Sequence, residues 1–289
     1  MAREAGAAGP VRRRRPGPRG RPVPRPRAAY AAGMLLGIDH LVIAVRDPDA
    51  AAADFEEMLG LAATGGGRHE RAGTFNRLIF LGDTYIELIG IWDRTLAAAN
   101  PIGAAAVTAL DAGSPGLVTW AIATDGARRE VASLRAAGSP IGDAVPGERH
   151  RPDGGVVRWH TAAAAPLGPG RPPFLIEHEL AGPEWGEEAR RARAAFVHPF
   201  GGMAQLIGLE LAVEHPADAA AEFARTLGLA FDPAAGDEPG DLEARVGDQS
   251  IRLVGSGSPS GGPPARVGLL ATAGMHVLVD VCGVRFARL

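Results

Sequence analysis

"LVIAVRDPDAAAADFEEMLGLA", residues 41–62, returns later in the chain as "LELAVEHPADAAAEFARTLGLA", residues 209–230. The two copies align without a gap and share 12 of their 22 residues. Each begins as an apolar strand, places proline in the first turn of a helix and reaches glycine where that helix should end. In the first copy, Asp47 is the expected N-cap and Gly60 the expected C-terminal cap.

A weaker third copy, "GLVTWAIATDGARREVASLRAAG" at residues 116–138, lies between these two. Strand-like segments follow every copy: "NRLIFLG" and "TYIELIG", then "VVRWHTA" and "PFLIEHEL", then "LEARVGD" and "QSIRLVG". The C-terminal tail adds two more strands without a helix. The sequence therefore predicts an α+β fold of repeated βαβββ modules, which form cupped mixed β-sheets with helices on the outside. We expect the first module to pair with the second, and the third with the tail.

The repeats divide the chain into four segments. We expect a disordered extension rich in arginine and proline at 1–33, a two-module domain at 34–182, a linker at 183–207, and the third module with a partial fourth at 208–289. The extension has nine arginines and one acid, so it cannot bury apolar surface. An upstream start codon, with Met34 as the true first residue, is an alternative explanation of this segment.

The composition excludes several classes of protein. All 30 basic residues are arginine, and the part after the extension has 21 of them against 32 acids, which makes nucleic acid an unlikely partner despite the basic extension. The single cysteine, Cys282, excludes a disulfide framework and suits the reducing cytoplasm. Because no run of about 18 apolar residues exists, we expect no membrane span. A homodimer stays open.

A glutamate in the middle of a strand raises the question of function. Glu87 stands between Ile86 and Leu88, and an unpaired buried carboxylate costs several kcal/mol, about 2 to 7 or more. Since side chains alternate along a strand, Glu87 and His40 should project into the same concave face. We expect the two to meet across a cation, or to form a hydrogen-bonded pair.

These segments resemble a known family. "IDHLVIAV", "GGRHERAGTFNRLIFLGDTYIELIG", "DGGVVRWHTA", "PPFLIEHEL", "HPFGG" and "VCGVRF" are similar to the glyoxalase-like domain proteins of the vicinal-oxygen-chelate superfamily, over residues 36–289. The resemblance implies paired βαβββ modules around one open site, with metal ligands on the first and last strands of each module. It implies isomerase, lyase, thiol-transfer or ring-opening dioxygenase chemistry, in which a divalent ion polarises substrate oxygens.

The resemblance also implies which residues hold the metal. His40 and Glu87 occupy the two positions of the first module. In the second module Thr119 stands where His40 stands, and Glu177 takes the place of Glu87. Three protein ligands with open positions are typical of a catalytic site. We therefore expect His40, Glu87 and Glu177 to bind a divalent ion such as Zn²⁺, Mn²⁺, Fe²⁺, Ni²⁺ or Mg²⁺.

Other polar residues are candidates for catalysis or substrate binding. His69 and Asn76 are the expected catalytic residues, His69 because histidine titrates near neutral pH. Thr74, Arg158 and His198 are expected to contact substrate, although a surface loop or an edge ion pair would explain them equally. The leading hypothesis is a metal-dependent lyase, isomerase or dioxygenase acting on a small oxygen-bearing metabolite. The alternative is a metal-free protein of the same fold that sequesters a small molecule.

Overall fold

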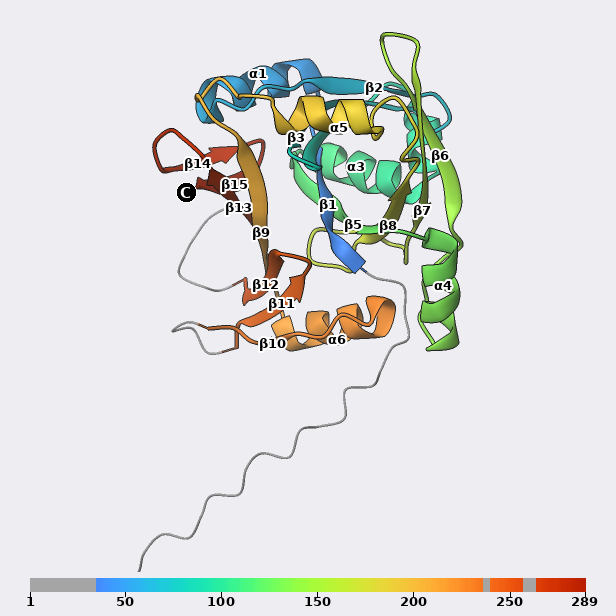
Figure 1. Cartoon of the computed structure of the whole chain (residues 1–289). Helices are drawn as coiled ribbons and strands as arrows, with labels where there is room; N and C mark the ends of the chain where they lie inside the picture. Colours follow the sequence, from blue (N-terminus) through green and yellow to red (C-terminus); the bar gives the residue numbers. More distant parts are fainter. Residues whose placement is uncertain (1–34, 236–239, 257–263) are drawn as a thin grey trace, which may run out of the picture. The chain divides into compact units, whose positions relative to one another are not determined.

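The computed structural model describes residues 35–235, 240–256 and 264–289. The extension expected at 1–33 lies outside the described residues. The described strands form two sheets, a closed barrel of eight strands and a second sheet of seven strands (Figure 1). The α+β fold with repeated modules is confirmed. No helix among the described residues is long and apolar enough to cross a bilayer.

The first module has the caps that its sequence predicts. Its elements are β1 (Leu35–Ala44), α1 (Pro48–Leu59), β2 (Gly65–His69), β3 (Thr74–Leu81) and β4 (Thr84–Ile91). The Asp47 side chain accepts hydrogen bonds from the backbone N–H groups of Asp49 and Ala50. Gly60 ends the helix at a φ of 66°, a left-handed conformation that glycine adopts without strain.

The second module pairs with the first within the same chain. Its elements are β5 (Gly116–Thr124), α4 (Ala127–Ala136), β6 (Val145–His150), β7 (Val156–Ala162) and β8 (Phe174–His178). The strand order around the barrel is β1, β4, β3, β2, β6, β7, β8 and β5. An extended antiparallel ladder joins β1 to β5, whereas β2 meets β6 only through the pair Arg68 and His150. At this junction a Cβ on Gly67 would lie 2.1 Å from the carbonyl oxygen of His150, so only glycine permits closure.

Two helices between the modules were not expected from the sequence. They are α2 (Arg94–Ala98) and α3 (Pro101–Asp111). The Asn100 side chain accepts a hydrogen bond from the backbone N–H of Gly103, and Pro101 follows as the first helical residue. In Figure 1, α3 lies amid the barrel strands, and its Ala106 packs with Val42 on the inner face. One helix therefore fills part of the cup, while α1 packs outside it.

The third module pairs with the C-terminal tail, as the repeats predict. The helix α5 (Glu187–Ala194) precedes it. The module consists of β9 (Ala204–Val213), α6 (Pro216–Leu227), β10 (Asp232–Pro233), β11 (Leu242–Val246) and β12 (Gln249–Gly255). The tail supplies β13 (Ala265–Ala271), β14 (Val277–Val281) and β15 (Val284–Arg288). The strand order of this sheet is β10, β11, β12, β9, β13, β15 and β14.

One apolar core joins the two sheets. Leu41 and Ile43 of β1 point away from the barrel interior and pack in the same cluster as Phe55 of α1, as expected from strand alternation. Leu209 and Phe286 of the second sheet belong to the same cluster. The outer face of β1 is therefore packed into this core, while the inner face of the barrel carries both apolar and polar side chains.

Candidate functional site

The interior of the barrel holds a cavity of about 950 Å³. Its described wall is formed only by residues between His40 and Glu184, so the seven-stranded sheet contributes nothing to it. One part of the wall is apolar, with Ile89, Ile102 and Phe174. The polar part of the wall surrounds Glu87, where several buried polar side chains meet. Glu87 is therefore the centre of the candidate site.

Glu87 has three polar neighbours from three strands. Its Oε1 accepts a hydrogen bond of 2.7 Å from the Asn76 side-chain amide on β3. Its Oε2 lies 3.6 Å from Nε2 of His40 on β1, and Oε1 lies 4.0 Å from Nε2 of His69 on β2. The structure thus brings His40, His69, Asn76 and Glu87 to one place in the cavity.

A carboxylate that sequence reasoning missed orients His40. Asp39 Oδ1 lies 2.6 Å from His40 Nδ1, and both Asp39 oxygens lie 3.1 Å from His178 Nε2. Burial alone raises the pKa of Asp39, but the charge of His178 and the hydrogen bonds from both histidines hold that pKa well below its usual range. An ionised Asp39 can only accept hydrogen bonds, so His40 carries a proton on Nδ1 and presents Nε2 to Glu87.

Strict alternation of side chains along β1 predicts that Asp39 faces outward, opposite to His40. The pairing of β1 with β5 shifts register between Ile38 and His40, which lets two consecutive side chains face inward. His178 on β8 also binds Asp39. The dipeptide Asp39–His40 in an otherwise apolar strand was the available signal, but alternation argued against using both residues.

His69 is a buried histidine with an unusually low proton affinity. The pKa of His69 is lowered to about 4, mainly by burial; the charge of Glu87 raises it, and the charges of Arg149 and His40 lower it. Its Nδ1 lies 2.8 Å from the Thr74 hydroxyl. Near neutral pH the ring is therefore uncharged. Thr74 therefore holds His69 and also lines the cavity.

A buried ion pair forms another part of the wall. Arg149 on β6 is 3% exposed, and its Nη2 donates to both carboxylate oxygens of Glu184 at 2.6 and 2.5 Å. Its Nη1 donates to Asn76 Oδ1 at 3.4 Å. The Arg149 Nε–H is buried and has no protein partner. Sequence reasoning missed this pair, because Arg149 and Glu184 lie in separate segments without a shared motif.

Arg158 and His198, both expected to contact substrate, lie in different places. Arg158 lines the cavity, but its side chain is 57% exposed and lies near the carboxylates of Glu148 and Glu179, at 3.8 and 3.9 Å. His198 is buried outside the cavity. Its Nε2 lies 3.0 Å from the Phe80 carbonyl oxygen and its Nδ1 accepts from the Ala62 backbone N–H, so neither nitrogen is free for a ligand.

The expected metal ligand Glu177 does not join His40 and Glu87. Its Oε2 accepts a hydrogen bond of 3.0 Å from the backbone N–H of Ala127, at the start of α4. The strand registers explain why. Val42 lies opposite Glu87 in the first module, and the corresponding pair in the second module is Ala121 and Phe174.

Phe174, and not Glu177, therefore takes the structural place of Glu87 in the second module. Its ring lies 5.3 Å from the His40 ring, centroid to centroid. With Thr119 at the other position, the second module offers neither of the two expected ligand side chains. Over the ranges that the structure describes, no group of three or more His, Cys, Asp or Glu side chains is arranged to hold a metal ion. The residues present do not fit the three-ligand site that the sequence predicts.

One solved structure agrees with this fold over most of the chain. The crystal structure of a hypothetical protein from Staphylococcus aureus superposes with a TM-score of 0.68 at 15% identity, over 88% of this chain and 99% of that one. Methylmalonyl-CoA epimerases from Streptomyces coelicolor and Mycobacterium tuberculosis match with TM-scores of 0.38, at 18% and 20% identity. They cover 50% and 52% of this chain, and 99% and 93% of their own chains.

Curated proteins yield no match to this chain. A family model described as a glyoxalase-like domain matches residues 38–227, which include the strands that enclose the cavity. That span is more than half of the sequence and carries the residues around Glu87. The protein therefore belongs to the glyoxalase-like domain family.

Proposed function

We propose that the chain is an enzyme that binds a small oxygen-bearing metabolite inside the barrel and moves a proton of that molecule with Glu87. The observation that carries the proposal is the carboxylate of Glu87, which faces the cavity between the Nε2 atoms of His40 and His69. A buried carboxylate with imidazole neighbours is the arrangement that general acid–base catalysis requires. The reaction class is isomerisation or elimination beside a carbonyl group.

Each neighbouring residue has a role in this reaction. Glu87 takes a proton from the carbon next to the substrate carbonyl. In isomerisation it returns this proton to another carbon or to the other face; in elimination the group on the adjacent carbon leaves with its bonding electrons as the double bond forms, and the protonated Glu87 gives it the proton. The guanidinium of Arg149, which lines the cavity, places positive charge near the oxygen that becomes negative. Asn76 holds the Glu87 carboxylate through its side-chain amide. His69 is uncharged near neutral pH, and its Nε2 lies 4.0 Å from Glu87.

The charges of the cavity favour an uncharged substrate. Six carboxylates contribute to the wall against three arginines. The carboxylates are those of Glu87, Asp143, Glu148, Glu177, Glu179 and Glu184, and the arginines are Arg71, Arg149 and Arg158. A substrate with several negative charges would be repelled by this excess. Arg158, expected to hold a substrate carboxylate, already has two acidic neighbours.

The proposal is independent of a bound metal, because Phe174 and Thr119 replace two of the four ligand positions that the family resemblance implies. A divalent ion held by His40 and Glu87 alone would need most of its ligands from water or substrate. The metal-dependent form of the hypothesis is therefore tested in the same experiment, and so is the alternative that the protein only sequesters its ligand.

The test is deuterium exchange by a panel of small uncharged ketones, aldehydes and hydroxyketones in D₂O, followed by NMR. We expect the purified protein to accelerate exchange at the carbon beside one carbonyl, and Glu87→Gln to reduce the rate at least about a hundredfold. Rates should be equal in EDTA and in added Mn²⁺ or Zn²⁺. Exchange that survives Glu87→Gln, or that requires the added metal, would refute the proposal. A compound that binds without any exchange would support sequestration instead.

A further inference from the structure

Two consecutive residues of the segment between β8 and α5, Glu184 and Trp185, are buried although the segment was expected only to connect modules. Glu184 is 7% exposed and Trp185 is 5% exposed. Each begins a separate chain of contacts, and the two chains end at the two members of the pair formed by His40 and Glu87.

The first chain runs from Glu184 to Glu87. Glu184 binds the Arg149 guanidinium, and the Arg149 Nη1 donates to Asn76 Oδ1. A guanidinium only donates, so it directs the oxygen of the Asn76 amide toward itself. The Asn76 nitrogen is thereby directed to Glu87, where it donates at 2.7 Å. Glu184 thus fixes the orientation of an amide that holds the proposed base.

The second chain runs from Trp185 to His40. The Trp185 indole stacks on the His178 imidazole, with ring centroids 3.9 Å apart and an interplanar angle of 21°. His178 Nε2 lies 3.1 Å from both oxygens of Asp39, and Asp39 binds His40 Nδ1. Tyr85 stacks on the His40 ring, with ring centroids 4.3 Å apart. Trp185 therefore restrains the histidine that holds the Asp39 carboxylate.

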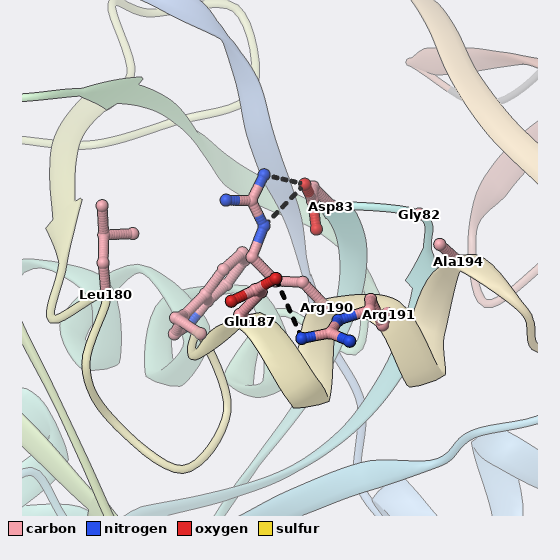
Figure 2. A pocket seen from close by; sticks show the side chains of 8 residues that line it. Gly82, Asp83, Leu180, Glu187, Arg190, Arg191 and Ala194 are labelled. Atoms are coloured by element: carbon pink, nitrogen blue, oxygen red, sulfur yellow. Dashed lines mark hydrogen bonds and ion pairs between the residues drawn. The ribbon is translucent and has the colours of Figure 1, made fainter.

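The segment is attached to the barrel from outside by α5. None of the α5 residues is buried, and the helix is held mainly by arginines. Figure 2 shows Arg190 reaching Asp83 of the turn between β3 and β4, where its Nη2 donates at 2.6 Å and its Nε at 3.0 Å. The Arg193 guanidinium lies 4.7 Å from the Trp185 ring centroid and also pairs with Asp83. The contacts of α5 with the turn between β3 and β4 thus help to fix the position of Glu184 and Trp185.

We propose that Glu184 and Trp185 are positioning residues of the proposed site, which hold Glu87 and His40 through two separate chains of side chains. The proposal rests on the proposed function only in calling the pair catalytic. Neither residue touches the reacting atoms. Each acts on a different member of the pair, which makes the two effects separable.

The experiment compares Glu184→Gln and Trp185→Leu with Glu187→Gln, a matched control on α5 whose side chain is 84% exposed. NMR without substrate records hydrogen exchange of the Asn76 side-chain amide, and the ¹⁵N signals of the His40 ring. Glu184→Gln leaves the buried Arg149 charge without its counter-charge, so the Asn76 amide should exchange about tenfold faster, a change of about 1.4 kcal/mol. The His40 ring signals should stay at their wild-type positions.

Trp185→Leu should have the opposite effect on the two sets of signals. The His40 ring signals should move while exchange of the Asn76 amide stays within about twofold of wild type. Trp185→Phe serves if the leucine variant does not fold. The proposal is overturned if both variants change both sets of signals together, which indicates general loosening, or if neither set differs from that of Glu187→Gln.

The signals are recorded without substrate, so they decide the positioning role even if the deuterium exchange experiment fails. Where exchange activity is found, both variants should lower kcat more than they change KM, because they displace catalytic groups and leave the apolar wall intact.

Discussion

Removal of one buried amide should weaken the connection between the two sheets. Gln249, on β12, is 8% exposed and bonds the backbone of both sheets. Its Oε1 accepts from the Ile38 N–H at 2.6 Å, and its Nε2 donates to the carbonyl oxygens of Ile38 and Leu206 at 3.2 and 3.3 Å. Gln249→Ala leaves one buried donor and two acceptors without this partner.

The size of the effect follows from these three bonds. A buried hydrogen bond contributes about 1 kcal/mol and an unsatisfied group costs about 1 to 3 kcal/mol, so we expect the free energy of unfolding to fall by about 3 kcal/mol. For a unit of this size that corresponds to a decrease in Tm of about 6 to 12 °C. The measurement is urea denaturation, supported by calorimetry.

Gln205 provides the matched control, since it is the same residue type on β9 of the same sheet but is exposed. Gln205→Ala should change stability by less than about 0.5 kcal/mol. If Gln249→Ala loses no more than about 1 kcal/mol, or no more than Gln205→Ala, the bonds from Gln249 do not tie the barrel to the second sheet, and the reasoning fails.

Two further predictions concern a cap and a buried histidine. A Cβ at Gly60 would lie 2.7 Å from the Phe200 Cβ, whereas Gly113 has a similar φ of 69° and open space. Gly113→Ala should therefore cost about 1 kcal/mol and Gly60→Ala about 3 kcal/mol or more, and equal losses of Tm would contradict the predicted clash. His69 has a pKa of about 4, below the 6.5 of a free histidine. Between these pH values only the unfolded chain binds the proton, so lowering the pH from 7 to 4 should remove about 3 kcal/mol of stability, a loss that His69→Leu should escape. Denaturation of both proteins at the two pH values tests this, and parallel losses would rule it out.

The sequence predicted the architecture well because the repeat carries its own local signals. Asp47, Pro48 and Gly60 bound a helix whatever surrounds it, and the second copy at 209–230 shows that the unit is used again. The inserted helices fall outside the repeat, so α3 had no copy with which to align. Its Asn100–Pro101 cap was a local signal that was present in the sequence and was not used.

The site was harder to predict because it depends on register. A β-bulge turns Asp39 inward, and the alternation of side chains along a strand does not predict a bulge. In the second module, Glu177 and Phe174 are three positions apart, and only the pairing of β8 with β5 shows which one corresponds to Glu87. The ion pair of Arg149 with Glu184 joins residues 35 positions apart, so no local sequence pattern predicts it.

Closure of the barrel limits where another polypeptide can add a strand to this protein. Every strand from β1 to β8 has a neighbour on both sides, so the described part of the barrel has no edge strand, and its weakest junction is the single residue pair between β2 and β6. The edge strands lie in the other sheet. They are β10, which has two residues, and β14, where Leu278 is 60% exposed. Strand addition by a second molecule would have to begin at β14, on a sheet that contributes nothing to the cavity wall, and would leave the cavity wall unchanged.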